Sequence, residues 1–327
     1  MSEQRTAPPV QPTAPDRAVR STAGQQRLAR RRPGTTLARR RVRTGILLTL
    51  PALLALAVTV VYPILWTVSL SVQSFSISAN AEPARFAGLA NYRKIVGSPA
   101  FQSAMLHTLG FVATTLVVEL VLAFPVALTL HRAWRGSRAA RVVVALPLMV
   151  APVVASLAWK FLFSNGYGLI NHALDLVGVT PPSWFASVWL ARTTVLVTNL
   201  WLALPFDILV LLAGLAALPA EPLEAALIDG ANRWQVFRYI TLPLLRPAIL
   251  IILIVRLADA FRIFDSVYVL TGGGPGNATD VMSSYLYRLM FTNIDFAGGA
   301  AASVSLVLVM AASAVAIFVL LRPREAT

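Results

Sequence analysis

The chain has 327 residues, of which 57% are hydrophobic and 13% are charged. A soluble globular domain carries about 25% charged residues, so this composition excludes an ordinary soluble protein. The formal net charge is +14, a basic balance that nucleic-acid-binding proteins also show. Eleven of the arginines, however, fall within residues 1–43, and most of the others lie in short loops between apolar runs. This distribution argues against nucleic acid and is typical of a membrane protein with basic cytoplasmic ends.

Residues 1–43 precede the first long apolar run and are rich in Pro, Arg, Gln and Thr. Such a segment buries too little apolar surface to offset the entropy of ordering, so it is predicted to be a disordered cytoplasmic tail. The apolar run that follows is longer than the about 7 to 15 residues of a signal-peptide core. It is interpreted as a retained membrane helix, with a twin-arginine export signal as the alternative.

Charge-poor runs and turn signals divide the rest of the chain into six predicted membrane spans, each compatible with the roughly 20 residues that cross the hydrocarbon layer. The predicted fold class is an all-α, polytopic membrane protein with six transmembrane helices. The membrane domain is predicted over residues 44–322, with a cytoplasmic end at 323–327. The spans have the approximate limits 45–71, 106–130, 142–164, 193–217, 247–270 and 297–321.

Basic residues set the predicted orientation of the spans. The connection 131–141 carries four arginines and the connection 218–246 carries three, whereas the connections on the other side are poorer in basic residues for their length. Connections rich in Lys and Arg stay in the cytoplasm. Both termini are therefore predicted to be cytoplasmic, in a multi-pass protein of the plasma or inner membrane.

The connection between spans four and five is polar and carries two helix signals. Pro222 suits the first turn of a helix, and Glu224 suits its positive N-terminal end. A short helix is therefore predicted over 223–229, with Gly230 as its stop. A second short helix is predicted over 233–239, ending before a proline.

Apolar residues on these two short helices predict a compact knob. Leu227, Ala231 and Trp234 are its expected members. Two short helices that meet at a glycine form a plug suited to a groove on another protein. A solvated amphipathic loop is the alternative.

The same connection carries a spaced pattern, E-A-A-x-x-D-G-A followed by F-x-x-I-x-L-P-x-x-x-P. The pattern resembles the cytoplasmic loop of permease subunits of binding-protein-dependent ABC importers. In that family the loop forms a coupling helix that docks on an ATPase subunit. The resemblance assigns this coupling to Glu224, Ala225, Ala226, Asp229, Gly230 and Ala231.

Two other segments resemble the carbohydrate-type permeases of this family, such as those for maltose or glycerol-3-phosphate. Residues 86–111 resemble the F-x-G-L-x-N-Y segment that enters span two. Residues 264–280, followed by two tyrosines, resemble the F-D…L-T-G-G-G-P loop after span five. The resemblance covers about residues 45–321 and implies a sugar or sugar-like substrate. His107 departs from the pattern, which often has Asn there.

The glycine run after span five, Gly272, Gly273, Gly274 and Pro275, predicts a tight outer turn. Contact with an extracytoplasmic binding protein is its expected role. A phosphate cradle is the alternative, but the sequence shows no helix N-terminus or lysine to complete one.

Span five contains charges at i,i+3 spacing, where residues of opposite sign can pair. Arg256, Asp259, Arg262 and Asp265 predict a slanted stripe that climbs about 13 Å along one helix. Ionisable groups in a membrane usually face the bundle interior or water. The stripe is interpreted either as part of a translocation path or as a structural salt-bridge ladder.

Aromatic residues near the same stripe are candidates for contact with a sugar face, or for packing between helices. The residues assigned to the translocation path are Phe261, Arg262, Asp265 and Tyr268, with Phe264 as a further aromatic candidate. Two isolated acids in other spans, Glu119 and Asp207, are interpreted as hydrogen-bonding partners between helices.

The chain is predicted not to be an enzyme. It holds no P-loop motif, no cysteine and no His, Asp or Glu cluster with metal spacing. It is therefore expected to bind no cofactor or metal, with ATP and Mg²⁺ on a separate ATPase. The resemblance implies four partners besides membrane lipid: a second, different permease subunit that forms a heterodimer with this chain, two ATP-binding-cassette subunits, and an extracytoplasmic sugar-binding protein.

Three other functions stay open at this stage. An ABC permease for a non-sugar solute would share the loop but not the two sugar-type segments. An ion-coupled secondary transporter would use Glu119, Asp207 and the charges of span five as an ion path, and it leaves the 221–247 loop unexplained. An integral membrane enzyme would need a convergent catalytic cluster, which the sequence does not show.

Overall fold

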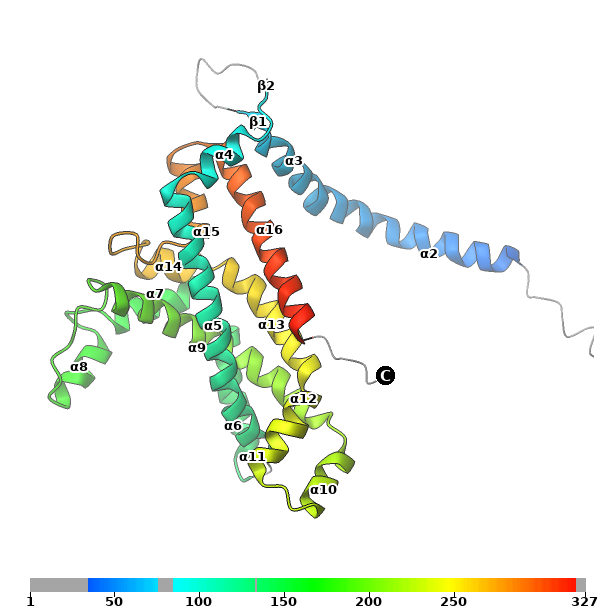
Figure 1. Cartoon of the computed structure of the whole chain (residues 1–327), viewed down its shortest axis with the longest axis vertical. Coiled ribbons are helices and arrows are strands. Elements are labelled where there is room, and N and C mark those ends of the chain that lie inside the picture. The colour runs from blue at the N-terminus through cyan, green and yellow to red at the C-terminus, as the bar shows by residue number, and fades with distance from the viewer. Residues whose placement is uncertain (1–34, 76–84, 133, 322–327) are drawn as a thin grey trace, which may run out of the picture. The chain divides into compact units, whose positions relative to one another are not determined.

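The computed structural model describes residues 35–75, 85–132 and 134–321, with side chains from residue 46 onward. Most of these residues are helical (Figure 1). The chain divides into two compact units, Met1–Ile64 and Leu65–Thr327. Residues 1–34 of the predicted tail and the predicted end at 323–327 lie outside the described residues. Residues 35–43, predicted as the last part of the tail, are helical.

The described part of the first unit is one helical segment. Helix α2 (Thr35–Leu56) continues through a π-helical turn, η1 (Ala57–Val61), into the first residues of α3 (Tyr62–Ser71). The π turn lies just before Pro63, which has no N–H for the regular i−4 bond. Its side chains from residue 46 to residue 64 are exposed. A helix that is apolar on all sides needs apolar surroundings, which a bilayer supplies.

The second unit is built around four long helices. Helices α5 (Pro99–His131) and α9 (Val188–Ala216) pack along each other, and α13 (Arg246–Phe261) packs against both. Helix α16 (Phe296–Leu321) packs against α13 and against the short helix α4 (Ala90–Val96).

Small residues allow the close approach of these helices, as is usual in membrane bundles. Ala123 and Ala127 of α5 are fully buried against leucines of α9 and α13. The approach is closer still at Gly214 of α9, because a Cβ at that position would lie 2.9 Å from Leu245 Cδ2 and 3.0 Å from Ala248 Cβ. The first turns of α16, residues 297–302, are small and buried in the same way.

Four described helical segments are long and apolar enough to cross a membrane: Ile46–Ser71, Pro99–His131, Val188–Ala216 and Phe296–Leu321. Two bent helix pairs also qualify, so the described residues hold six spans if each pair is one span. The prediction of an all-α, polytopic membrane protein is confirmed, and six spans are compatible with the structure.

The third predicted span, 142–164, is not one helix. Helix α6 (Ser137–Ala145) runs into a 3-10 turn, η2 (Leu146–Met149), and then meets α7 (Pro152–Leu162) at an angle of 101°. The residue before Pro152 is extended, with φ −64° and ψ 136°, because proline disfavours the helical conformation in its predecessor. The predicted third span is therefore a sharply bent pair of helices.

The fifth predicted span, 247–270, is also interrupted. Helix α13 ends at Phe261, and a separate short helix, α14, occupies Asp265–Leu270. The break frees the backbone carbonyl of Ile263, which accepts a hydrogen bond from the Ser283 hydroxyl. A partner distant in sequence thus stabilises a break that the local pattern does not signal.

Short elements complete the second unit. Strands β1 (Gln73–Ser74) and β2 (Arg85–Phe86) form a small antiparallel pair with Gln73 opposite Phe86. The remaining helical elements are α8 (Leu169–Leu176), α10 (Ala220–Ile228), α11 (Arg233–Val236), η3 (Phe237–Thr241), α12 (Leu242–Leu244), α15 (Met282–Tyr287) and η4 (Arg288–Thr292).

Candidate functional site

The connection after α9 is an ordered helical hairpin, which we call the 220–244 hairpin. Helix α10 ends at Ile228, and Gly230 follows with φ +77°, a left-handed conformation that favours glycine. Gly230 is therefore the helix stop that the sequence predicts. Asn232 then caps α11, since its Oδ1 accepts from Gln235 N at 2.9 Å while its own N–H donates to Gln235 Oε1 at 2.7 Å.

The second helix of the hairpin is longer than predicted. Helix α11 continues through the π turn η3 and through α12 to Leu244. The predicted end before Pro243 is wrong, because the π turn lies just before the proline and accommodates its missing N–H. The hairpin consequently joins α13 with only Leu245 between them.

The hairpin exposes large apolar side chains. Ile228 is 87% exposed, Trp234 68% and Leu227 66%. The acids Glu224 and Asp229 are also exposed, whereas Ala226 is buried against the hairpin. Figure 1 shows α10 and α11 at the end of the second unit, beyond the ends of α5 and α9. This mixture of apolar and acidic groups is typical of a surface that binds another protein.

Aromatic rings in contact connect this exposed surface to the bundle. The ring centroids of Trp234 and Phe237 lie 5.6 Å apart. Phe237 in turn meets Phe124 of α5 edge to face, with centroids 5.7 Å apart. A displacement of Trp234 therefore reaches α5 through one intervening ring.

Inside the bundle, one guanidinium faces three carboxylates, a group we call the Arg256 cluster. Arg256 of α13 donates to both carboxylate oxygens of Glu119 on α5, at 3.1 and 3.3 Å, and to Asp259 at 3.1 Å. Asp207 of α9 lies 3.8 Å from Arg256 Nε, and within the described residues neither of its carboxylate oxygens has a hydrogen-bond partner. Glu119 is 1% exposed and Asp207 0%.

The Arg256 cluster joins three helices and corrects the predicted stripe. Arg256 does pair with Asp259 at i,i+3, but Arg262 and Asp265 lie beyond the end of α13 at Phe261. Neither of those two has an ion pair among the residues that the structure describes. The interpretation of Glu119 as a hydrogen-bonding partner between helices is confirmed, whereas Asp207 makes no side-chain hydrogen bond within the described residues.

Four aromatic side chains from two segments form a continuous row, which we call the aromatic row. Phe264 and Tyr268 stack at 5.1 Å between centroids, and both meet Tyr287, at 5.3 and 5.4 Å. Phe291 follows Tyr287 at 5.3 Å. Tyr268 is 51% exposed and Phe291 67%, so the row presents accessible ring faces.

The four residues assigned to the translocation path separate into different environments. Phe261 is buried in an apolar cluster with Leu257 and Val112. Arg262 and Tyr268 are exposed, and Asp265 is partly exposed. Of these four, the structure brings only Tyr268 into the aromatic row.

The glycine run after α14 folds as a tight turn, as the sequence predicts. Gly272 and Gly273 have φ of +60° and +90°. The Thr279 hydroxyl donates to Gly274 O at 2.6 Å and lies 2.8 Å from the Thr271 hydroxyl, which closes the loop.

The chain following this turn is fixed by an ion pair. Arg288 Nη1 donates to Asp280 Oδ1 at 2.9 Å, and this hydrogen bond raises the pKa of Arg288 above its ordinary value. Ser284 also donates to Asp280 Oδ1, at 2.6 Å. The pair holds α15, and with it Tyr287 of the aromatic row, against the turn.

Residues 119–326 match the family of the binding-protein-dependent transport system inner membrane component. The chain belongs to this family. It is therefore a multi-pass membrane component of a transport system, and the matched region contains the 220–244 hairpin, the Arg256 cluster and the aromatic row.

Among the relatives, the chain is 35% identical over 266 residues to the trehalose/maltose transport system permease protein MalF of Thermococcus litoralis. The match covers 81% of this chain and 89% of the relative. It is also 34% identical over 273 residues to the trehalose transport system permease protein SugA of Mycobacterium tuberculosis, covering 84% and 86% of the two chains.

A solved structure shares the fold. A chain of a bacterial alginate ABC transporter, in complex with an alginate pentasaccharide-bound periplasmic protein, matches with a TM-score of 0.76 at 22% identity. The match covers 88% of this chain and 97% of that chain.

Sequence reasoning missed several residues that the structure places at these sites. Ile228 is the most exposed member of the hairpin, and Phe291 completes the aromatic row. The four-residue spacing between Tyr287 and Phe291 could have indicated that Phe291 belongs to the aromatic row, since i,i+4 residues share a helix face. No local signal indicates that Asp280 pairs with Arg288.

Proposed function

We propose that this chain is a permease subunit of an ABC importer and that, with a second permease subunit, it forms the translocation path for a sugar or sugar-like solute. The single observation that carries the proposal is the 220–244 hairpin, which exposes Leu227, Ile228 and Trp234 beside two acids. A member of a transport family that has no P-loop of its own needs an energy source outside the chain. The exposed hairpin is suited to bind the subunit that supplies this energy.

In this proposal an ATPase subunit docks on the hairpin, and its residues Glu224, Ala225, Ala226, Asp229, Gly230 and Ala231 carry the coupling. Force on Trp234 reaches α5 through Phe237 and Phe124. Force along α12 reaches α13 through the 65° bend at Leu245, and Arg256 then transmits it to α5 through Glu119. ATP binding thereby shifts the population between two arrangements of the spans.

The proposed substrate class rests on the aromatic row and on the relatives. Trehalose, maltose and alginate are carbohydrates, and each is named for a relative or a fold neighbour. The exposed rings of Tyr268 and Phe291 offer flat apolar faces of the kind that binds the hydrocarbon face of a sugar ring. Arg262 and Asp265, at the break after α13, are polar candidates for its hydroxyls.

The proposed assembly contains a second, related permease, two ATP-binding-cassette subunits that bind ATP and Mg²⁺, and an extracytoplasmic sugar-binding protein. The binding protein contacts the turn at Gly272, Gly273, Gly274 and Pro275. Both termini lie in the cytoplasm, on the side of the hairpin. Family membership and the periplasmic protein in the alginate complex support this assembly.

The coupling proposal is tested by a matched pair of tryptophan variants. Trp234 is 68% exposed on the hairpin, and Trp134 is 46% exposed in the preceding connection on the same predicted side. In the purified complex in proteoliposomes, we expect Trp234→Ala to reduce ATP-driven uptake of trehalose or maltose at least tenfold. We expect Trp134→Ala to leave uptake within about twofold of the unchanged complex.

Two results would contradict the proposal. One is equal uptake by the two variants. The other is a chain that purifies without an ATPase and moves sugar under a proton or sodium gradient alone, which would identify an ion-coupled transporter. Mass spectrometry of the proteins that co-purify with the tagged chain shows whether an ATPase is among them.

A further inference from the structure

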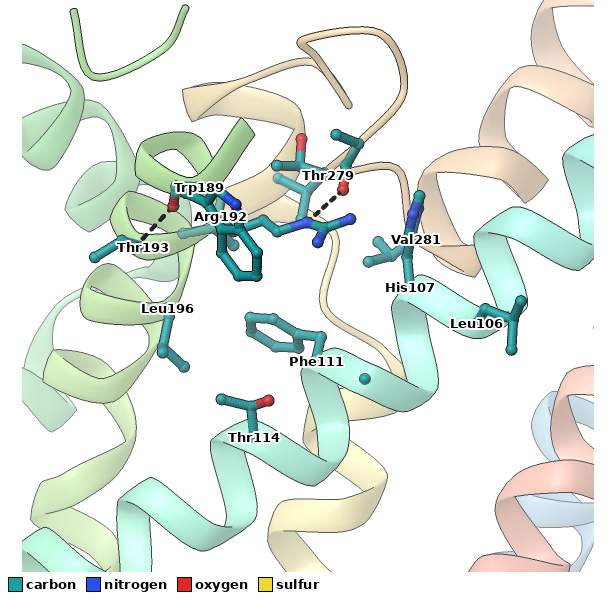
Figure 2. A pocket seen from close by; sticks show the side chains of 14 residues that line it. Leu106, His107, Phe111, Thr114, Trp189, Arg192, Thr193, Leu196, Thr279 and Val281 are labelled. Atoms are coloured by element: carbon teal, nitrogen blue, oxygen red, sulfur yellow. Dashed lines mark hydrogen bonds between the residues drawn. The ribbon is translucent and has the colours of Figure 1, made fainter. Parts of the chain in front are cut away.

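A pocket of about 310 Å³ lies between the first turns of α9 and the facing part of α5 (Figure 2). Val267 of α14 and the backbone after the glycine turn complete it. Its lining is mostly apolar, with Phe111 and Leu196 on opposite helices. The pocket is separate from the 220–244 hairpin, the Arg256 cluster and the aromatic row.

One cation, Arg192, lines this apolar pocket. Its Nε donates to the Ala278 carbonyl at 2.9 Å, and its guanidinium lies 5.8 Å from the Trp189 ring centroid. Figure 2 shows the guanidinium projecting into the pocket on the side of His107. Arg192 has no ion pair within the described part of the chain, and the acid near this loop, Asp280, is held by Arg288 and Ser284.

The lengths of two helices place this cation at the edge of the hydrocarbon layer. Helix α9 has 29 residues and is therefore about 43 Å long, roughly 13 Å more than the hydrocarbon core. If the excess is shared between its ends, the first four residues lie in the headgroup layer, and Arg192 is the fifth. Helix α5, with 33 residues, independently places Leu106 and His107 near the same depth.

The mouth of the pocket has the character of a lipid-facing surface. Leu106 is 68% exposed and Trp189 75%. Tryptophan at the end of a transmembrane helix is typical of the membrane interface. An apolar cavity with an exposed aliphatic rim is therefore open to acyl chains.

We propose that this pocket binds one phospholipid of the surrounding bilayer. Its phosphate accepts hydrogen bonds from the Nη groups of Arg192, which have no hydrogen-bond partner among the described residues, and one acyl chain lies between α5 and α9. A guanidinium binds phosphate oxygens in a bidentate geometry. The phosphate also supplies the counter-charge that Arg192 lacks within the described chain.

The apolar lining distinguishes a lipid from a free anion or a sugar. A free phosphate would leave Phe111, Leu196 and Val267 without a partner. A sugar would place many hydroxyls against the same apolar walls, where unpaired polar groups are costly. A phospholipid satisfies both the charge and the apolar surface.

Gly110 provides a direct way to fill the pocket. It lines the cavity, and a Cβ built on it meets no heavy atom within 4 Å. Gly110→Leu therefore extends an apolar side chain toward the acyl site from a position where a Cβ is unobstructed, and it replaces a poor helix former by a good one. Gly166→Leu is the matched control, because a Cβ at Gly166 also meets nothing within 4 Å, outside the pocket.

The test is native mass spectrometry of the assembled, delipidated complex titrated with dioleoyl phosphatidylglycerol. We expect Gly110→Leu to lose one bound lipid per chain and Gly166→Leu to keep it. Arg192→Gln removes one charge-assisted contact and should weaken lipid binding about tenfold. Arg93→Gln, which removes an exposed cation of α4, should leave lipid binding unchanged.

Several results would overturn the proposal. Unchanged lipid occupancy in Gly110→Leu excludes an acyl chain in the pocket. Displacement of the lipid by millimolar inorganic phosphate identifies a free-anion site, and displacement by trehalose or maltose identifies a solute site. Because the readout is bound lipid and not uptake, failure here is distinguishable from failure of the proposed transport function.

Discussion

Two arginines on the membrane-spanning helices differ in the partners that surround their charge. Arg256, in the bundle interior, faces three carboxylates from three helices. Arg192, near the start of α9, meets a backbone carbonyl and a tryptophan ring but has no ion pair among the described residues. A charge far from water needs a protein partner, whereas a charge at the rim can use headgroups or water. The difference in partners reflects the depth of each arginine in the membrane. Replacing each side chain measures how much its partners contribute to stability.

The largest expected effect is at Arg256. Arg256→Gln leaves Glu119 and Asp207 buried without a cation, and breaking a buried pair in this way costs about 3 to 5 kcal/mol. We expect a strongly lowered thermal unfolding midpoint of the purified complex, or loss of the assembled complex from the membrane. A midpoint equal to that of the unchanged complex would show that the cluster is not structural.

A smaller effect is expected at the two acids, and they should differ from each other. Glu119→Gln weakens two charge-assisted hydrogen bonds to Arg256, at a cost of roughly 1.5 to 3 kcal/mol. Asp207→Asn weakens only an ion pair at 3.8 Å, so its cost should be clearly lower. The comparison is made by thermal unfolding, and equal losses would mean that Asp207 contributes as much to stability as Glu119 does.

A still smaller effect on folding is expected at Arg192. Arg192→Gln gives up the hydrogen bond to the Ala278 carbonyl but also removes a charge without an acid partner. The net change should therefore stay within about 1 kcal/mol. A loss as large as that of Arg256→Gln, measured in the same unfolding experiment, would abolish the contrast between the two arginines.

The smallest effect is expected at Lys94, which pairs with Asp295 at 2.9 Å but is 70% exposed. Exposed pairs contribute about 0 to 1 kcal/mol. Lys94→Gln should therefore leave the unfolding midpoint almost unchanged at physiological salt. A marked loss would indicate that the pair is shielded from water in the assembled complex.

The features that are predictable from the sequence are local ones. The stop at Gly230 follows from one residue whose conformational freedom the turn requires. The number of apolar runs and the tight turn at Gly272 follow from composition and from glycine. Each of these needs information from only a few neighbouring positions.

The features that the sequence does not reveal depend on distant partners. The end of α13 at Phe261 is stabilised by Ser283, and the Arg256 cluster joins residues of three helices. Pro147 and Pro152 indicate a kink in the third span, but neither predicts an angle of 101°. The aromatic row likewise needs α15 to be held by Asp280 and Arg288.

The close contact at Gly214 has an evolutionary consequence. A larger residue there would meet Leu245 and Ala248 at about the distance of a clash. The helix crossing between α9 and α13 therefore restricts which substitutions can become fixed. Gly214→Ala should be tolerated mainly in sequences that already carry a smaller side chain at position 245. Positions 214 and 245 are thus expected to vary together among the permeases of this family. The loss of stability caused by Gly214→Ala should be reduced when Leu245→Ala is added.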